Sequence, residues 1–299
     1  MSINTNEPIG IFDIGSNSVR FVVYAPPFDH QKDLFNEKVQ CSLGKDLVRT
    51  KRLYPEGKSR ALKAMKGFQS IAEAMDVRQF YAVGTAALRD AEDGEAFVKE
   101  VYDLTGFNVQ IISGEEEAML AAKSVLSKFP EADGIIGDLG GGSLELARVK
   151  NYQVTSPISY HLGVLRIMAQ DDARAYVQAQ LENVPEVLQH TKSLYVIGGT
   201  WRALADLHMQ STAHESHKLS GYTVPHEEMR YFAKKISLMA PEDIMEKFVV
   251  APKRATMLPS ASILMVELTK HLHFDNIVIS TTGLRNGLLR DVLDRQLAA

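Results

Sequence analysis

An internal repeat limits the fold of this chain more than any other feature of its sequence. Residues 11–19 read Ile-Phe-Asp-Ile-Gly-Ser-Asn-Ser-Val, and residues 136–144 read Ile-Gly-Asp-Leu-Gly-Gly-Gly-Ser-Leu, 125 positions later. Each copy has an apolar run, an Asp, a turn rich in Gly or Ser, and then apolar residues again. Two copies at a spacing close to one domain length indicate a duplicated domain rather than an array of short repeats.

The residues after each turn predict a strand and not a helix. Residues 19–24 and 144–149 are short segments rich in β-forming residues, which gives the order strand, turn, strand. A P-loop or a dinucleotide-binding loop would open a helix at this point. The P-loop pattern is also absent, because Gly57-Lys58-Ser59 has Arg52 where the upstream glycine would stand.

The rest of the chain alternates between strand and helix patterns, which predicts an α/β fold. Strands are predicted at 79–83, 107–112, 153–160, 194–197 and 276–280, and helices at 56–75, 85–104, 115–129, 171–188, 201–209, 227–239, 253–272 and 284–297. The length of 299 residues fits two domains, predicted at 1–130 and 131–299 with a turn-rich hinge at 130–134.

Composition and charge exclude several classes of protein. A net charge of −4 and a pI near 6.2 argue against general electrostatic binding to nucleic acid. The longest apolar runs, such as 261–266, are far shorter than the roughly 20 residues of a membrane helix. Residues 1–8 lack the basic and apolar parts of a signal peptide. The single cysteine, Cys41, rules out a disulfide framework, which favours a reducing compartment. Together these features predict a cytoplasmic protein with no membrane or nucleic-acid partner.

Three glycine-rich turns follow predicted strands and are candidate phosphate-binding sites. Glycines let a ligand approach the backbone closely, successive N–H groups in such a turn attract anions, and hydroxyl groups add donors. The alternative is a set of tight turns that bind nothing. The candidate phosphate-binding residues are Gly15, Ser16, Asn17, Ser18, Gly140, Gly141, Gly142, Ser143, Gly198, Gly199 and Thr200.

Three acidic residues flank two of these turns. Asp13 and Asp138 lie at the ends of the preceding strands, and Glu145 follows the second turn. A carboxylate would repel a bare phosphate but suits a cation that holds phosphates. Hard oxygen ligands favour Mg²⁺, with Mn²⁺ as an alternative, so Asp138, Glu145 and Asp13 are the candidate metal ligands.

Two helix starts carry candidate catalytic groups. The acidic run Glu115-Glu116-Glu117 either complements a helix dipole or points one glutamate at a water for in-line attack. Arg89 lies in the second turn of a helix that Thr85 opens, where a guanidinium is able to grip a terminal phosphate. The alternative for this segment is a capping threonine with a solvated arginine.

Eight basic residues crowd positions 45–66, opposed only by Asp46 and Glu56. This run is either a solvated helix face or a track for an extended polyanion. The candidate track residues are Lys45, Arg49, Lys51 and Arg52.

No zinc site is expected from the histidines before Gly221, whose spacing matches no common pattern: His208, His214 and His217.

Seven segments form a series that runs nearly from end to end. They are Asp13-Ile14-Gly15-Ser16-Asn17-Ser18-Val19-Arg20, Thr85-Ala86-Ala87-Leu88-Arg89-Asp90-Ala91, Ile112-Ser113-Gly114-Glu115-Glu116-Glu117-Ala118, Asp138-Leu139-Gly140-Gly141-Gly142-Ser143-Leu144-Glu145, Leu162-Gly163-Val164-Leu165-Arg166, Gly198-Gly199-Thr200-Trp201-Arg202-Ala203-Leu204-Ala205 and Thr282-Gly283-Leu284-Arg285-Asn286-Gly287-Leu288-Leu289. In this order they resemble the Ppx/GppA family of exopolyphosphatases and guanosine pentaphosphate phosphohydrolases. Each segment alone is a weak signal, but seven in the family's order are specific.

The resemblance implies an actin-like ATPase fold: two ribonuclease-H-like α/β domains with the active site in the cleft between them. Longer relatives carry a C-terminal HD-like helical domain, and the resemblance implies a short two-domain form without it. It also implies a homodimer. The implied fold agrees with the internal repeat and the strand, turn, strand pattern.

The resemblance also implies roles for individual residues. The family's catalytic base lies in a G-x-E-E-A motif, and matching Gly114 and Ala118 places it at Glu116, with Glu117 as the adjacent acid. The family's arginine in T-x-A-L-R falls on Arg89. Its metal-binding Asp and Glu fall on Asp138 and Glu145.

We therefore expect a Mg²⁺-dependent hydrolase that removes terminal phosphate from inorganic polyphosphate and, as a second substrate, from guanosine pentaphosphate. The alternatives are an enzyme that acts mainly on guanosine pentaphosphate, a kinase of the same fold, and a non-catalytic sensor of polyphosphate or alarmones.

Overall fold

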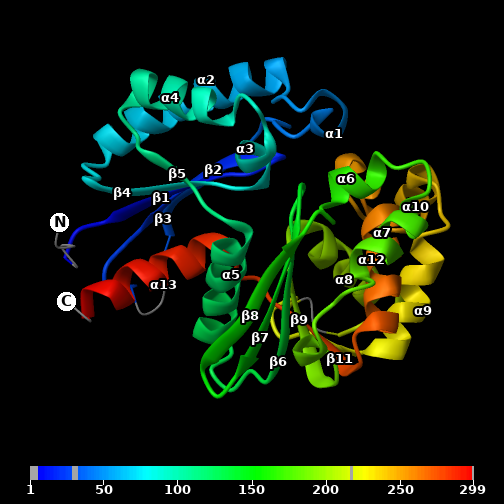
Figure 1. Ribbon diagram of the computed structural model, residues 1–299. Helices are drawn as coiled ribbons and strands as arrows, with labels where there is room; N and C mark the ends of the chain where they lie inside the picture. The colour runs from blue at the N-terminus through cyan, green and yellow to red at the C-terminus, as the bar shows by residue number, and fades with distance from the viewer. Residues whose placement is uncertain (1–5, 29–32, 216–217, 298–299) are drawn as a thin grey trace. The chain divides into compact units, whose positions relative to one another are not determined.

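Two compact units make up the chain in this computed structural model, which describes residues 6–28, 33–215 and 218–297 (Figure 1). The first unit comprises Met1–Leu120 together with Leu284–Ala299, and the second comprises Ala121–Gly283. The first unit is therefore discontinuous in sequence. The border between the units lies after Leu120, within a helix, and not at the predicted residue 130. Residues 284–299, which the sequence analysis places in the second domain, belong to the first unit.

The closing helix belongs to the first unit because it covers an apolar sheet face there. Leu284, Leu288 and Leu289 of α13 (Leu284–Leu297) are buried in one cluster with Ile9 and Ile11. Gly287 lies so close to Leu120 that a Cβ would overlap its carbonyl oxygen. The sequence pattern predicted this helix at the right residues but could not show which sheet it covers.

The first unit has a five-stranded sheet in the order β3-β2-β1-β4-β5. β1, β2 and β3 are antiparallel neighbours, and β1, β4 and β5 are parallel. Its elements are β1 (Ile9–Ile14), β2 (Ser18–Tyr24), β3 (Asp33–Gln40), α1 (Leu47–Thr50), α2 (Pro55–Ala74), β4 (Gln79–Gly84), α3 (Ala86–Asp90), α4 (Gly94–Thr105), β5 (Val109–Ile111) and the start of α5 (Gly114–Lys128). Figure 1 shows α2 and α4 over one face of the sheet and α13 over the other.

The second unit has a six-stranded sheet in the order β10-β11-β9-β6-β7-β8. Its strands are β6 (Gly134–Leu139), β7 (Leu144–Lys150), β8 (Gln153–Tyr160), β9 (Thr191–Ile197), β10 (Thr223–Pro225) and β11 (Phe274–Ile279). Its helices are α6 (Val164–Met168), α7 (Ala173–Leu181), a short 3₁₀ helix (Glu186–Leu188), α8 (Gly199–Ser211), α9 (His226–Ile236), α10 (Pro241–Lys247), α11 (Pro252–Ala255) and α12 (Leu258–His271).

The two sheets confirm the duplication that the repeat predicts. Read from β8, the second sheet runs β8-β7-β6-β9-β11, which matches β3-β2-β1-β4-β5 strand for strand. The repeated turns are also alike, since the Gly15 N–H donates to Ser18 O and the Gly140 N–H to Ser143 O, both at 3.0 Å. The α/β fold with two ribonuclease-H-like units is thus the observed one.

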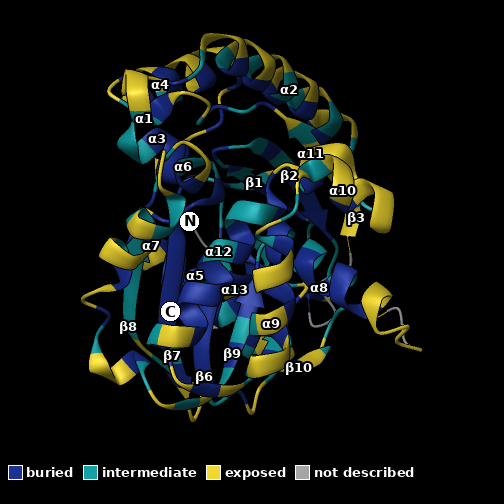
Figure 2. Cartoon of the chain, turned by 90° about the vertical axis from the view of Figure 1, so that its right-hand side faces the viewer, coloured by how far each residue is buried: buried dark blue, intermediate teal, exposed yellow. Residues whose placement is uncertain are grey.

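The central strand of the first sheet is buried on both faces. Phe12 stacks on Phe21 with ring centroids 4.2 Å apart and packs on Phe107 at 4.4 Å, beneath α2. Ile9 and Ile11 point to the α13 face, as the two-residue period of a strand requires. Figure 2 shows the exposed residues gathered on the outer sides of helices such as α2 and α9, with β6 and β7 buried.

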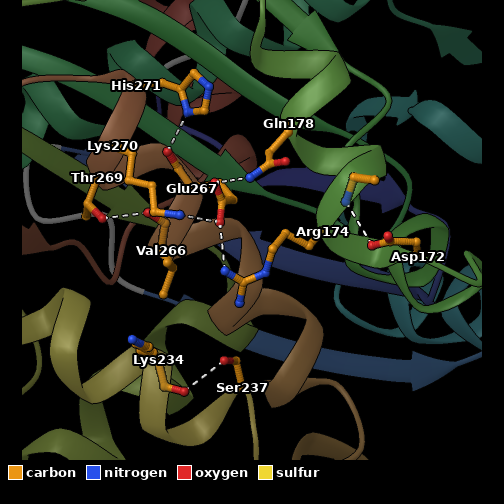
Figure 3. A network of polar contacts seen from close by, with 11 residues as sticks. Asp172, Arg174, Gln178, Lys234, Ser237, Val266, Glu267, Thr269, Lys270 and His271 are labelled. Atoms are coloured by element: carbon orange, nitrogen blue, oxygen red, sulfur yellow. Dashed lines mark hydrogen bonds and ion pairs between the residues drawn. The ribbon is translucent and has the colours of Figure 1, made fainter.

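The helical layer of the second unit contains a buried ionic network on α12. Glu267 is 0% exposed and receives hydrogen bonds from Lys270 at 2.9 Å and Gln178 at 3.0 Å, with Arg174 at 3.4 Å (Figure 3). Two of these partners come from α7, so the network ties α7 to α12. A buried carboxylate is stable only with partners of this kind.

Three predicted helices are shorter or interrupted. Residues 85–104 form α3 and α4, which are separated where the backbone of Ala91 is extended, and Gly94 begins α4 in close contact with Leu88. Residues 253–272 form α11 and α12, and residues 171–188 form α7 and the 3₁₀ helix after Pro185. The sequence patterns missed the exposed strand β3 and the short strand β10.

In the described part of the chain no helix is both long and apolar enough to cross a membrane.

Candidate functional site

The segment that follows β3 is hydrogen-bonded to the turn after β1. The Cys41 and Ser42 N–H groups both donate to Asn17 O, at 3.0 and 2.9 Å, and the Gly44 N–H donates to Ser16 O at 2.8 Å. The carbonyl oxygens in the middle of the turn are therefore occupied. Such a turn presents its N–H groups, which is the arrangement of an anion-binding nest.

Two polar side-chain atoms in this turn are buried without a protein partner. Ser16 is 4% exposed, and neither its Oγ nor Asn17 Oδ1 has a hydrogen-bond partner among the described residues. An unsatisfied buried polar atom costs about 1–3 kcal/mol, so native proteins retain one mainly for a reason. A bound anion would accept a hydrogen bond from the Ser16 hydroxyl, whereas Asn17 Oδ1 accepts and would need a donor such as water.

The turn after β6 is tied down in the same way by the segment that follows β8. The Val164 and Leu165 N–H groups donate to Gly140 O and Gly141 O at 3.1 and 2.9 Å. The side chain of Arg166 donates to Gly142 O at 2.7 Å. As in the first unit, carbonyl oxygens of the turn are occupied by a neighbouring segment, while the first N–H of the turn, that of Gly140, closes the turn on Ser143 O.

The turn after β9 opens α8 and carries an arginine that the sequence patterns did not single out. Gly198 has φ +105°, a conformation that only glycine adopts without strain. Arg254 of α11 donates to Thr200 Oγ1 at 3.0 Å, and its guanidinium lies directly over Gly199. Burial lowers the pKa of Arg254. Arg254 lies at the start of the predicted helix 253–272, and that local pattern gave no signal for a contact with Thr200.

Arg89 and Glu117 meet in the first unit. Arg89 Nη1 lies 3.3 Å from Glu117 Oε2 and donates to Ile112 O at 2.9 Å. Glu117 is only 8% exposed. The predicted catalytic Arg and one predicted glutamate are therefore brought together at the start of α5.

Glu116, the neighbouring glutamate, has a different local role. Its Oε2 accepts from the Ser113 N–H at 2.8 Å, and its own N–H donates to Ser113 Oγ at 3.1 Å. This reciprocal pair is a capping box, which stabilises the first turn of a helix. Glu116 is exposed, as is Glu115, so the structure points to Glu117 as the member of the acidic run that lies beside Arg89.

The three candidate metal ligands have different surroundings. Asp138 on β6 and Glu145 on β7 are directly opposite each other in the antiparallel pair, and Glu145 accepts from Ser159 Oγ at 2.8 Å. Asp13 is instead paired with Arg285 of α13. No group of three or more His, Cys, Asp or Glu side chains able to hold a metal ion occurs among the described residues.

Asp138 and Glu145 still fit a magnesium ion. Mg²⁺ in phosphate-transfer sites is held by one or two carboxylates, while the substrate phosphates and water complete the octahedron. The opposed pair on β6 and β7 supplies these two carboxylates next to the Gly140–Ser143 turn. Asp13 has a second role, because its ion pair fastens α13 to β1.

His208, one of the histidines before Gly221, has a protein partner at each ring nitrogen. His208 lies in α8, where its Nδ1 contacts the Tyr222 hydroxyl at 2.8 Å and its Nε2 lies 3.3 Å from Glu228. Burial lowers the pKa of His208. His217 lies outside the described residues.

Comparisons with known proteins agree with this architecture. A model of the Ppx/GppA phosphatase family matches residues 22–296. A crystal structure of an exopolyphosphatase from Cytophaga hutchinsonii aligns with a TM-score of 0.85 at 23% identity, covering 97% of this chain and 98% of that one. A Ppx/GppA family member from Aquifex aeolicus aligns with a TM-score of 0.80 at 23% identity, covering 97% and 98%.

Two curated relatives share part of their length with this chain. A bifunctional 3-dehydroquinate synthase/phosphatase of Fusobacterium nucleatum is 25% identical over 297 residues, covering 90% of this chain and 44% of the relative. Retrograde regulation protein 2 of Saccharomyces cerevisiae is 28% identical over 345 residues, covering 97% and 56%. The chain spans about half the length of these relatives. Since the family model covers nearly all of it, the chain belongs to the Ppx/GppA phosphatase family.

Proposed function

We propose that this protein is a Mg²⁺-dependent phosphoanhydride hydrolase that releases orthophosphate from the end of inorganic polyphosphate. The observation that carries the proposal is the Gly15–Ser18 turn, where the Ser16 hydroxyl, which is able to donate to a phosphate oxygen, is buried without a partner among the described residues and the carbonyl oxygens of Ser16 and Asn17 are occupied. Family membership supports a phosphorylated substrate. The 23% identical exopolyphosphatase of the same fold is consistent with polyphosphate.

Glu117 is the better candidate for the general base. In the proposed reaction its carboxylate takes a proton from a water, whose oxygen attacks the terminal phosphorus. The bond from this phosphorus to the bridging oxygen breaks, which releases orthophosphate and a chain shorter by one phosphate. Arg89, 3.3 Å from Glu117, holds this carboxylate in place and offers its remaining N–H groups to the phosphate.

Asp138 and Glu145 would hold the metal ion in this proposal. Mg²⁺, when bound, would neutralise charge on the phosphate oxygens. The Gly140–Ser143 turn and the Gly198–Thr200 turn, with Arg254 over the latter, would hold phosphates through N–H and guanidinium donors. Mn²⁺ is the natural substitute because it accepts the same oxygen ligands.

The substitution Glu117→Gln tests the catalytic role directly. We expect phosphate release to fall about 10²–10⁴-fold, as for a lost general base, while polyphosphate binding persists. Glu116→Gln is the matched control, since glutamine also completes a capping box and activity is expected to stay near the unsubstituted level. Loss of turnover in Glu116→Gln with normal turnover in Glu117→Gln would assign the base to Glu116 instead.

Substrate class is tested by phosphate release from tripolyphosphate, long-chain polyphosphate, guanosine pentaphosphate and ATP, with and without Mg²⁺. The proposal expects metal-dependent release from the polyphosphates. Faster release from guanosine pentaphosphate would favour the alternative hydrolase. Binding without release would support a sensor, and ADP formation that needs an acceptor would support a kinase.

The homodimer stays a prediction of the family resemblance. Light scattering on the purified protein checks it, with an expected mass of twice the 33.2 kDa chain.

A further inference from the structure

We propose that Ser159 is a positioning residue, whose hydroxyl holds the carboxylate of Glu145 in the orientation that binds the metal ion. This inference rests on the proposed function, in which Asp138 and Glu145 are the metal ligands. Ser159 lies on β8, and its Oγ donates to Glu145 Oε1 at 2.8 Å. Ser159 belongs to none of the glycine-rich turns, so the sequence patterns did not single it out.

Three polar residues form a ladder across neighbouring strands of the second unit. Asp138 on β6 pairs with Glu145 on β7, and Glu145 pairs with Ser159 on β8. Residues directly opposite each other in antiparallel strands point to the same face of the sheet, with Cβ atoms about 4.5–5.5 Å apart. The two carboxylates are therefore neighbours on one face, and the hydroxyl lies on the outer side of Glu145.

A β-bulge in β8 produces this pairing. Ser156 and Pro157 together face a single residue of β7, where the register shifts. Ser156 has φ +51°, the left-handed region of one common bulge type, and Pro157 has no N–H to leave unpaired. If the register beyond the bulge continued unchanged, Ile158 and not Ser159 would lie opposite Glu145. The bulge thus brings a hydroxyl to the carboxylate in place of an apolar side chain.

The partner that the bulge supplies is neutral. Glu145 is only 1% exposed, and a buried carboxylate needs hydrogen-bond donors. At the structural carboxylate of Glu267, the donors include the cations of Lys270 and Arg174, which compensate its charge. The hydroxyl of Ser159 instead orients the carboxylate without cancelling its charge. A donor of this kind suits a carboxylate that binds a cation.

The corresponding ladder of the first unit has a different charge. The internal repeat places Arg20 where the second unit has Glu145. Arg20 pairs with Asp13 on one side and with Lys38 on the other, so this ladder carries one acid and two cations. The pair of carboxylates supported by a hydroxyl is therefore a feature of the second unit, next to the Gly140–Ser143 turn.

The basic run of the first unit does not gather charge of one sign. The predicted track residues Lys45, Arg49 and Arg52 line a pocket of about 840 Å³, whereas Lys51 does not. Four basic side chains of this lining are matched by four acidic ones, so the lining has no net charge. The ladder of the second unit, in contrast, places two acids side by side.

The hydroxyl acts by restricting the carboxylate before the metal arrives. The terminal torsion of a glutamate is broad, so a carboxylate without support samples many orientations. A hydrogen bond on Oε1 narrows this range, and less order is then lost when the metal binds. Partners behind a metal ligand typically contribute roughly 10–100-fold in metal affinity or activity.

The substitution Ser159→Ala tests the positioning role. We expect the Kd for Mn²⁺, measured without substrate from the electron paramagnetic resonance signal of the free ion, to rise roughly tenfold. The Mg²⁺ concentration that half-saturates phosphate release from tripolyphosphate should rise by a similar factor, while kcat at saturating Mg²⁺ stays within about twofold. Ser159→Thr keeps the hydroxyl, so its metal affinity should match that of the unsubstituted protein.

Two further variants make the test specific. Thr155→Val removes an exposed hydroxyl from the same strand, opposite Arg148, and should leave metal affinity unchanged. Glu145→Gln removes the ligand itself and should abolish Mn²⁺ binding at the site. An unchanged Kd in Ser159→Ala, with or without a lower Tm, would make Ser159 merely structural and overturn the inference. An equal rise in Thr155→Val, or full binding by Glu145→Gln, would overturn it as well.

The outcome is separable from that of the proposed function. If the unsubstituted protein releases no phosphate from any substrate but Ser159→Ala still weakens Mn²⁺ binding, the proposed function fails and the positioning role holds. If phosphate is released and Ser159→Ala binds Mn²⁺ normally, the proposed function holds and the positioning role fails. Absence of Mn²⁺ binding by the unsubstituted protein would overturn the positioning role whether or not phosphate is released.

Discussion

At the start of α5, neighbouring residues of the same acidic run have different surroundings. Glu116 completes a capping box with Ser113, whereas Glu117 is buried beside Arg89. One step along a helix rotates a side chain by about 100°, so neighbours in the same acidic run face different surroundings. The difference separates a structural acid from a candidate base.

Gly198 is the residue whose conformation the third turn most needs. At φ +105° a Cβ would be strained, and it would also overlap the Leu139 carbonyl oxygen. Gly198→Ala is therefore expected to lower the free energy of unfolding by about 1–3 kcal/mol or more. Gly67→Ala is the control, since nothing lies within 4 Å of its Cβ position inside α2, and it should stabilise by about 0.5–1 kcal/mol. Urea unfolding of both variants measures this, and equal stability of the two would contradict the argument.

At the scale of elements, the ionic network of Glu267 joins α7 to α12. Burial alone would raise the pKa of Glu267, but hydrogen bonds from Lys270 and Gln178 and the charges of Lys270 and Arg174 lower it overall. A carboxyl whose folded pKa lies below its unfolded value stabilises the fold above the unfolded pKa. This stabilisation is lost as the pH falls through the folded pKa.

Glu267→Gln should remove this part of the pH dependence. At pH 7 we expect the variant to be less stable by about 1–3 kcal/mol, because a charge-assisted network loses its anion. Towards pH 3 the difference from the unsubstituted protein should shrink. Urea unfolding at several pH values checks this, with the exposed Glu246→Gln in the same unit as control. A difference that stays constant with pH would show that the lost interaction is not the ionised carboxylate.

At the scale of the whole molecule, the first unit depends on a helix from the far end of the chain. Burial of Leu284, Leu288, Leu289 and Val292 is worth about 6–12 kcal/mol in total at 1.5–3 kcal/mol for each side chain. That is as large as the entire stability of a typical domain. The fragment 1–130, which the sequence-based border would define, is therefore expected not to fold cooperatively.

A chain that joins residues 1–120 to 284–297 through a flexible linker should fold instead. Its control carries Leu288→Asp and Leu289→Asp, which place charges against Ile9 and Ile11 and should abolish folding. Circular dichroism and thermal unfolding measure all three chains. Cooperative folding of 1–130 alone would show that α13 is dispensable and would restore the border at 130.

The sequence by itself determined the duplicated α/β plan, the three turns and the family, because local chemistry decides each of them. Alternating apolar residues specify strands, and glycine and serine specify the turns. Asp138 and Glu145 face each other because they lie at paired positions of one hairpin. Only the tertiary structure decided which unit holds α13, which glutamate meets Arg89, that Asp13 pairs with Arg285, and that Arg254 covers Gly199. These are contacts between residues distant in sequence or differences in helical phase, and neither leaves a local pattern for a reader of the sequence to find.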